Sequence, residues 1–224
     1  HLTLRLIGPS GQDQRRTIGM AGEVPFQFSI LPNLGGNVYQ WSDVDSIKAN
    51  RFTNNRRGPV FHYALFANRF NFISGVQPKS GLSRNIPAAD FVVTLGPAVV
   101  GGGTTQEQEG TFIHELGHNL GLRHGGDQDI PERKPNYLSL MNYRFQFEGL
   151  ILANKKRKFD YSTNTLASLD EASLNETIGI SDPDNRRTIW GSIGFPCQTN
   201  LALPAIDWNC SGNLDLVNIP AEIN

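Results

Sequence analysis

The chain has 224 residues, a formal net charge of −1 at pH 7 and a charged fraction of 18%. This length allows a sizeable hydrophobic core, in one domain or in two subdomains that share a cleft. The balanced charge excludes a protein that holds nucleic acid or a membrane surface by bulk charge, and no apolar run approaches the roughly 20 residues that span a bilayer. We therefore expect no nucleic acid and no membrane among the partners, and we expect a monomer.

The first hundred residues mix short apolar runs with turn signals. Two runs, 59–67 and 89–95, are rich in β-branched and aromatic residues and are bounded by Pro or Gly, so both are predicted to be strands. His62 alternates with apolar neighbours in the first run, and we interpret it as a hydrogen-bonded sheet histidine. Between the turn signals, "SDVDSIKAN" at 42–50 predicts a short helix capped by Ser42.

A glycine-rich loop, "GPAVVGGGTTQEQEG" at 96–110, runs into a predicted helix that starts near Thr105. Glu107 and Glu109 would interact favourably with the positive end of the helix dipole. The helix continues into "HELGHNLGLRH" at 114–124, which holds three of the five histidines of the chain.

The spacing of these histidines predicts a metal site. His114 and His118 are four residues apart, so on a helix of about 3.6 residues per turn their imidazoles project from one face. Glu115 is rotated by about 100° from His114, so it is poorly placed as a ligand but can reach a water molecule at the same ion. This is the position of a general base.

Gly121 follows three residues after His118, where a positive φ can end the helix and turn the chain back. That turn would bring His124 to the ion as a third ligand. Three neutral imidazoles on Zn²⁺ leave one coordination position open, which is typical of a catalytic site. The alternatives are ordinary surface or core histidines, or a closed structural zinc; a structural site would need neither Glu115 nor an open position.

The extended pattern H-E-x-x-H-x-x-G-x-x-H, followed by "SLMNY" at 139–143, resembles the metzincin clan of zinc endopeptidases. The S-x-M-x-Y part is most similar to the Met-turn of the astacin and serralysin branches. The resemblance implies an α/β (α+β) fold in one catalytic domain, 1–224, with a twisted mixed sheet and the active-site helix in an upper subdomain, 1–121. An irregular lower subdomain, 122–224, would complete a cleft in which a substrate peptide adds an antiparallel strand to the sheet edge.

The same resemblance implies roles for two residues after the histidines. Met141 would form a hydrophobic floor under the three imidazoles, which differs little from the alternative of a methionine that fills the core. Tyr143 would contact zinc at rest and stabilise the oxyanion of the transition state, and the alternative is an ordinary packing aromatic.

These features predict a secreted zinc endopeptidase that acts on protein or peptide substrates, with Glu115 as general base. Two alternatives stay open. One is a zinc-stabilised binding module or inactive relative, which would have no reason to retain Glu115. The other is an enzyme that hydrolyses an amide bond in a non-peptide substrate. Cleavage of casein or gelatin separates these hypotheses.

The chain has two cysteines, Cys197 and Cys210, whose separation suits a disulfide around a small loop. A disulfide would imply an oxidising compartment, and with it an extracellular protein. The alternative is a pair of free buried thiols.

The segment 207–215, "DWNCSGNLD", resembles the first half of a calcium loop, with Gly212 at its sixth position. It departs from that pattern at the twelfth position, where Asn218 stands in place of Glu. The segment is therefore interpreted either as a calcium site or as a simple polar turn. The candidate Ca²⁺ ligands are Asp207, Asn209, Ser211, Asn213 and Asp215. A basic run, 155–158, is interpreted as a solvated surface.

Overall fold

The computed structural model describes residues 30–35, 38–51, 61–70, 79–95, 103–191, 197–198 and 205–223. Of the predicted elements, residues 96–102 of the glycine-rich loop and the first two residues of the strand at 59–67 lie outside this part of the chain.

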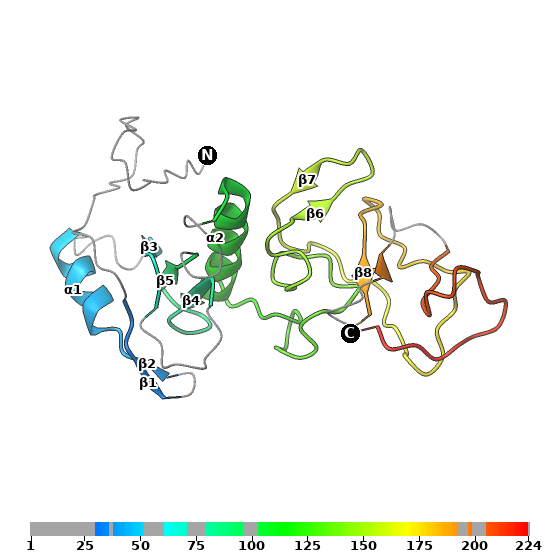
Figure 1. Ribbon diagram of the computed structural model, residues 1–224, viewed down its shortest axis with the longest axis horizontal. Helices are drawn as coiled ribbons and strands as arrows, with labels where there is room; N and C mark the ends of the chain where they lie inside the picture. The colour runs from blue at the N-terminus through cyan, green and yellow to red at the C-terminus, as the bar shows by residue number, and fades with distance from the viewer. Residues whose placement is uncertain are drawn as a thin grey trace.

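A mixed three-stranded sheet occupies one half of the molecule (Figure 1). Its central strand is β5 (Asp90–Val93), and all four of its residues are buried. Strand β3 (Tyr63–Phe66) pairs with β5 in parallel, and β4 (Gly81–Ser83) pairs with β5 antiparallel on the other side. Both predicted strands are therefore confirmed, and so is the α+β fold class.

His62 does not belong to the sheet, so the interpretation of it as a strand residue is wrong. The parallel ladder begins one residue later, where the Tyr63 N–H donates to Ala89 O at 2.7 Å. His62 is exposed, and its Nδ1 lies 3.2 Å from the side-chain amide of Asn119. The apolar alternation around position 62 thus predicts the strand but not its first residue.

The two helices flank this sheet (Figure 1). Helix α1 (Ser42–Arg51) confirms the predicted helix, but Ser42 is its first residue and not its cap, because the Asp45 N–H donates to Trp41 O at 2.9 Å. The Asp43 carboxylate accepts from the Leu31 N–H at 2.7 Å. This bond ties the start of α1 to the chain that enters a small hairpin of β1 (Asn33–Gly35) and β2 (Val38–Tyr39).

Helix α2 (Thr105–Asn119) packs against β4 and β5. Its Phe112 ring meets the buried Phe91 ring of β5 edge to face, with the centroids 5.1 Å apart. Leu116 packs on the same small cluster, which also contains Val93 and Leu95. These contacts fix the helix against the strand that lies at the centre of the sheet.

The chain after α2 forms the other half of Figure 1 and is mostly irregular. It contains two short hairpins, one of β6 (Leu150–Ile151) with β7 (Arg157–Lys158) and one of β8 (Ile189–Trp190) with β9 (Cys197–Gln198). The described residues beyond Asn119 include no α-helix. The basic run 155–158 is exposed around the first hairpin, as predicted.

This half has its own hydrophobic core. Trp190 and Trp208 meet edge to face at 5.3 Å, and the indole N–H of Trp190 donates to Trp208 O at 2.9 Å. The other fully enclosed members are Leu138, Leu140, Phe145, Leu150, Leu174, Ile180, Ile206 and Ile223. The separate core is consistent with a lower subdomain, although the boundary near residue 121 stays a prediction.

An ion pair is buried beside this core. The Asp182 and Arg186 side chains are 0% and 3% exposed, and Arg186 donates to the carboxylate from Nε at 3.0 Å and from Nη2 at 2.5 Å. Two charges in this environment satisfy each other through several hydrogen bonds, which is the condition for tolerating their burial.

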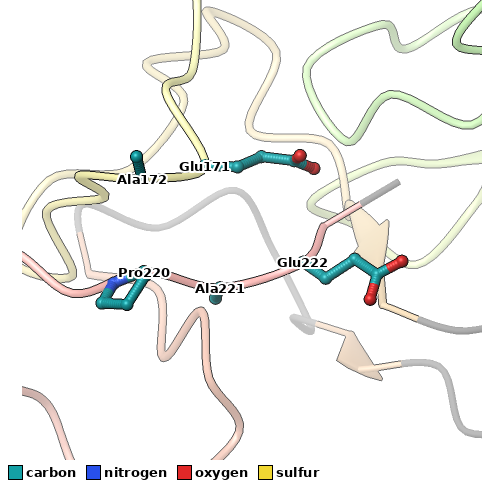
Figure 2. A pocket seen from close by; sticks show the side chains of 5 residues that line it. All are labelled: Glu171, Ala172, Pro220, Ala221 and Glu222. Carbon is teal, nitrogen blue, oxygen red and sulfur yellow. The ribbon is translucent and has the colours of Figure 1, made fainter.

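The C-terminal segment runs alongside residues 171–174. Leu174 and Ile219 exchange two backbone hydrogen bonds, of 2.8 and 2.9 Å. Figure 2 shows the shallow pocket at this junction, where Glu171 and Glu222 project from the two segments. The pocket contains no histidine, so it is separate from the predicted metal site.

Side chains of the second half contact both α2 and the residue before β4. The Gln146 side-chain amide donates to Ser80 Oγ, directly before β4, at 3.0 Å, and the Tyr161 hydroxyl donates to Ile113 O at 2.6 Å. Helix α2 is therefore held from both sides. Within the described ranges, no helix combines the length and the apolar character needed to cross a membrane.

Candidate metal centre

Helix α2 begins with a capping box. The Glu107 N–H donates to Thr104 Oγ1 at 3.2 Å, and the Glu107 carboxylate accepts from the Thr104 N–H at 2.7 Å. Two backbone donors at the helix start are thereby satisfied. Glu107 lies in the first turn as predicted, whereas Glu109 lies beyond it.

Helix α2 ends in the glycine turn that the sequence predicts. Gly121 has a φ of +96° and its N–H donates to His118 O at 2.9 Å, while the Leu122 N–H donates to Gly117 O at 2.9 Å. This pair of bonds is a Schellman motif, which requires a left-handed residue where Gly121 stands. The turn reverses the chain, so His124 comes back toward the helix.

The three predicted ligands converge. His114, His118 and His124 each offer a ring nitrogen, and these nitrogens all lie within 4.8 Å of one another. The Nε2 atoms of His118 and His124 are 3.0 Å apart. In the described part of the chain, this is the only group of three or more His, Cys, Asp or Glu side chains that could hold a metal.

Backbone carbonyls orient the two helical imidazoles. Nδ1 of His114 lies 2.8 Å from Leu140 O, and Nδ1 of His118 lies 2.9 Å from Leu122 O. With Nδ1 as the donor in each ring, Nε2 keeps its lone pair for a metal. Leu140 directly precedes Met141 and Leu122 follows the glycine turn, so both predicted turns help to aim the ligands.

The electrostatics of the three rings suit metal ligands. Burial lowers the pKa of His114 to about 3 and that of His118 to about 4, and it also lowers the pKa of His124. The imidazoles are therefore neutral at physiological pH, as metal coordination requires. Three neutral nitrogen donors fit Zn²⁺, for which imidazole is a common ligand.

Glu115 points toward the edge of the sheet. Its side chain is 5% exposed and lies against β4, where a methyl group at Gly81 would be 2.6 Å from Glu115 Cγ. Burial raises the pKa of Glu115 to about 8, and a backbone hydrogen bond from Ser83 and the charge of Lys79 oppose this rise. A carboxyl with such a pKa can exchange protons near neutral pH.

Met141 is fully buried under α2, next to Gly117. A methyl group at Gly117 would collide with Met141 Sδ and lie 2.9 Å from the Tyr161 ring. The Met141 N–H donates to Ser139 Oγ at 3.2 Å, which tightens the turn. The absence of a side chain at Gly117 thus lets the methionine approach the helix directly beside His118.

Tyr143 stacks on the histidines. Its ring is nearly parallel to that of His114, at 5.4 Å between centroids, and lies 4.4 Å from the ring of His124. Burial raises the pKa of Tyr143 to about 12, with contributions from Glu132 and Glu115. The phenol therefore keeps its proton at neutral pH and can donate a hydrogen bond.

Several residues near the site are not identified by the sequence reasoning. Lys79 precedes β4 and interacts electrostatically with Glu115, and the Arg133 guanidinium lies 5.5 Å from the centre of the Tyr143 ring. Asp129 lies beside His124. A single charged residue in an irregular segment is usually solvated, so its residue type does not indicate a role at the site. Only the positions of Lys79 before a short strand and of Gly81 within it could indicate that they lie near the helix.

Residues 94–139 match the family model Peptidase M66. The matched span contains all three histidines and Glu115, and it ends before Met141. No curated protein and no solved structure is significantly similar to the chain. The match and the histidine triad together indicate a metallopeptidase, with protein or peptide substrates.

The predicted calcium loop is a hydrogen-bonded turn. The Asp207 carboxylate accepts from the N–H groups of Ser211 at 3.0 Å and Gly212 at 2.7 Å, and the Asn209 amide donates to Asp215 Oδ2 at 2.9 Å. The exposed Asn213 donates its N–H to Ser211 Oγ at 3.2 Å. These contacts account for the oxygen side chains as turn residues, and calcium binding stays a prediction.

The predicted disulfide is present. Cys197 is bonded to Cys210, with 6.4 Å between the Cα atoms. The bond joins β9 to the polar turn at 207–215.

Proposed function

We propose that the chain is a zinc-dependent endopeptidase of the metzincin type. The observation that carries this proposal is the convergence of three neutral imidazoles beside a buried carboxyl, Glu115. The fully buried Met141 and the stacked Tyr143 add to it, because both stand at the positions of the predicted Met-turn.

His114, His118 and His124 would hold the ion. When bound, Zn²⁺ supplies Lewis-acid polarisation of the scissile carbonyl and activation of a water molecule. Glu115 would accept a proton from the attacking water and pass it to the leaving amine. Tyr143 would donate a hydrogen bond to the oxyanion that develops on the carbonyl oxygen.

The edge of the sheet offers a place for the substrate backbone. The Thr94 N–H donates to Ser80 O at 2.6 Å, and the Arg84 N–H donates to Asp90 O at 3.1 Å. The backbone groups of Ser80 and Arg84, which flank β4, therefore face β5. Alternate residues of an antiparallel strand face opposite ways, which turns the backbone groups of Gly81 outward. In the described sheet β3 and β4 are the two edge strands, and β4 is the one against which Glu115 lies. A peptide added there would pass the proposed base.

We also propose that the protein is exported. The support is the disulfide between Cys197 and Cys210, because disulfides persist mainly in oxidising compartments. Labelling of thiols in unreduced protein from its native source tests this point, and two labelled cysteines would contradict it.

Cleavage assays with matched variants test the enzymatic proposal. We expect the zinc-loaded protein to cut internal bonds of casein and of a peptide mixture, to lose activity with a chelator, and to recover it with Zn²⁺. Glu115→Gln keeps the size of the side chain and should retain zinc while activity falls by about 10²- to 10⁴-fold. Mass spectrometry of the products separates internal from terminal cleavage.

Each outcome addresses one part of the proposal. No cleavage by zinc-loaded protein would remove the peptidase function, and release of terminal residues alone would remove the endopeptidase assignment. Near-normal activity of Glu115→Gln would leave the metal site in place but exclude the role of Glu115 as base.

A further inference from the structure

The loop after the glycine turn folds back on itself. Arg123 and Gly126 exchange backbone hydrogen bonds of 3.2 and 3.1 Å, and the Gly125 N–H donates to Gln128 O at 2.8 Å. A methyl group at the buried Gly125 would lie 2.8 Å from Pro131 O, so the loop is closely packed around it. This closure brings Asp129 alongside the segment that carries His124.

The two carboxylate oxygens of Asp129 have different surroundings. Oδ2 accepts from Arg123 Nη1 at 2.7 Å. Oδ1 lies 3.4 Å from Nδ1 of His124, is buried, and accepts no hydrogen bond of normal geometry. A buried carboxylate oxygen without a donor is costly, and the nearby imidazole N–H can satisfy it after a small rotation of either side chain.

The third imidazole differs from the other two in what faces its Nδ1. His114 and His118 each have a backbone carbonyl within 2.9 Å of Nδ1. In the described structure, the group recorded at Nδ1 of His124 is instead the carboxylate of Asp129. The Nε2 atom of His124 faces Nε2 of His118. The ring of His124 therefore directs Nε2 to the metal site and Nδ1 to Asp129.

We propose that Asp129 is the positioning residue of the third metal ligand, an inference that rests on the proposed zinc function. Asp129 accepts a hydrogen bond from the Nδ1–H group of His124, fixes the tautomer with Nε2 free, and strengthens the imidazole as a donor to the metal. Arg123 holds the second carboxylate oxygen and so limits the rotation of Asp129.

The competing interpretation is that Asp129 serves only as an ion-pair partner of Arg123. The two side chains are 44% and 40% exposed, and such surface pairs contribute little to stability. The two interpretations differ in what removal of Arg123 should do. If only the ion pair matters, replacing Arg123 and replacing Asp129 should have the same effect. If Asp129 acts through His124, its carboxylate still does so after Arg123 is replaced.

Zinc affinity, measured by competition with a chromogenic chelator, provides the test. We expect Asp129→Ala to weaken zinc binding by about 10- to 100-fold and Asp129→Asn to weaken it less, because an amide oxygen can still accept the hydrogen bond. Arg123→Gln should have a much smaller effect. Asp127→Ala, at an exposed carboxylate in the same loop, is the matched control and should bind zinc normally.

The absorption spectrum of Co²⁺-loaded protein gives a second readout, because it reports ligand arrangement and not activity. We expect it to change in Asp129→Ala and to be retained in Asp127→Ala, while the melting temperatures of the metal-free proteins stay similar. If Asp129→Ala binds zinc as tightly as the unaltered protein, or if Arg123→Gln weakens binding equally, the inference is wrong and the proposed function stands. If the unaltered protein binds no zinc, both are wrong.

Discussion

The side chain of Glu115 lies directly against the backbone of Gly81: a methyl group at position 81 would be 2.6 Å from Cγ and 2.7 Å from Oε1. The carboxyl is enclosed, so it has little room to move aside. The proposed base and the strand edge that would hold the substrate are therefore in direct contact, through Glu115 and Gly81.

Gly81→Ala should displace Glu115. Because a misplacement of about 1 Å can cost about 100-fold in rate, we expect kcat to fall by up to that factor while zinc content is unchanged. Peptidase kinetics and elemental analysis on the same sample check this. Full activity would mean that Glu115 tolerates displacement and that its present position is not the reactive one.

Tyr143→Phe should lower kcat while KM changes little, because the phenol would act mainly in the transition state. The ring contacts with His114 and His124 do not need the hydroxyl, so we expect zinc affinity to be retained. A silent Tyr143→Phe, together with an inactive Glu115→Gln, would leave Tyr143 as a packing residue.

Gly117→Ala should destabilise the protein by about 1–3 kcal/mol through overpacking against Met141. Urea unfolding of the metal-free protein measures this effect. Met141→Ala alone should also be destabilising, because it leaves a cavity. The double variant should lose less than the sum of the two single variants, since the smaller residue makes room for the new methyl group. If the two losses of unfolding free energy add exactly in the double variant, Gly117 and Met141 do not interact.

Asp182→Asn should cost about 3–5 kcal/mol of unfolding free energy, because it removes the carboxylate that is buried with the enclosed Arg186 cation. Asp184 is a matched control: its carboxylate is half-exposed and lies 3.8 Å from Arg186 Nε. Asp184→Asn should change stability by less than about 1 kcal/mol. If the two variants lose equal unfolding free energy, burial of the Asp182 carboxylate does not determine its contribution to stability.

The parts of the site that depend on local sequence are predictable. The sequence predicts a helix start near Thr105, and it predicts the metal triad from the spacing of His114 to His124, because both depend on a helix and one turn. The strand at 90–93 is likewise read from a continuous apolar run.

Contacts across the fold are not predictable in this way. Lys79 and Gly81 meet Glu115 only because strand pairing places β4 beside α2, and the charge pattern of the chain does not encode that pairing. Asp129 lies close to His124 in sequence, yet its contact depends on how the loop closes around Gly125. The two-residue strands of the C-terminal half are too short to show an alternation.

The capped helix and the glycine turn also bear on the order of folding. The three histidines lie within residues 114–124, so local contacts bring their positions together, and local contacts form early. The carbonyl of Leu140, which orients His114, comes from a distant segment. The surroundings of Glu115 and Tyr143 depend instead on β4 and on the turn at 139–143, which must dock from distant positions in the chain. If the proposed function holds, a newly synthesised chain should bring its three metal ligands together before it assembles the surroundings of Glu115 and Tyr143.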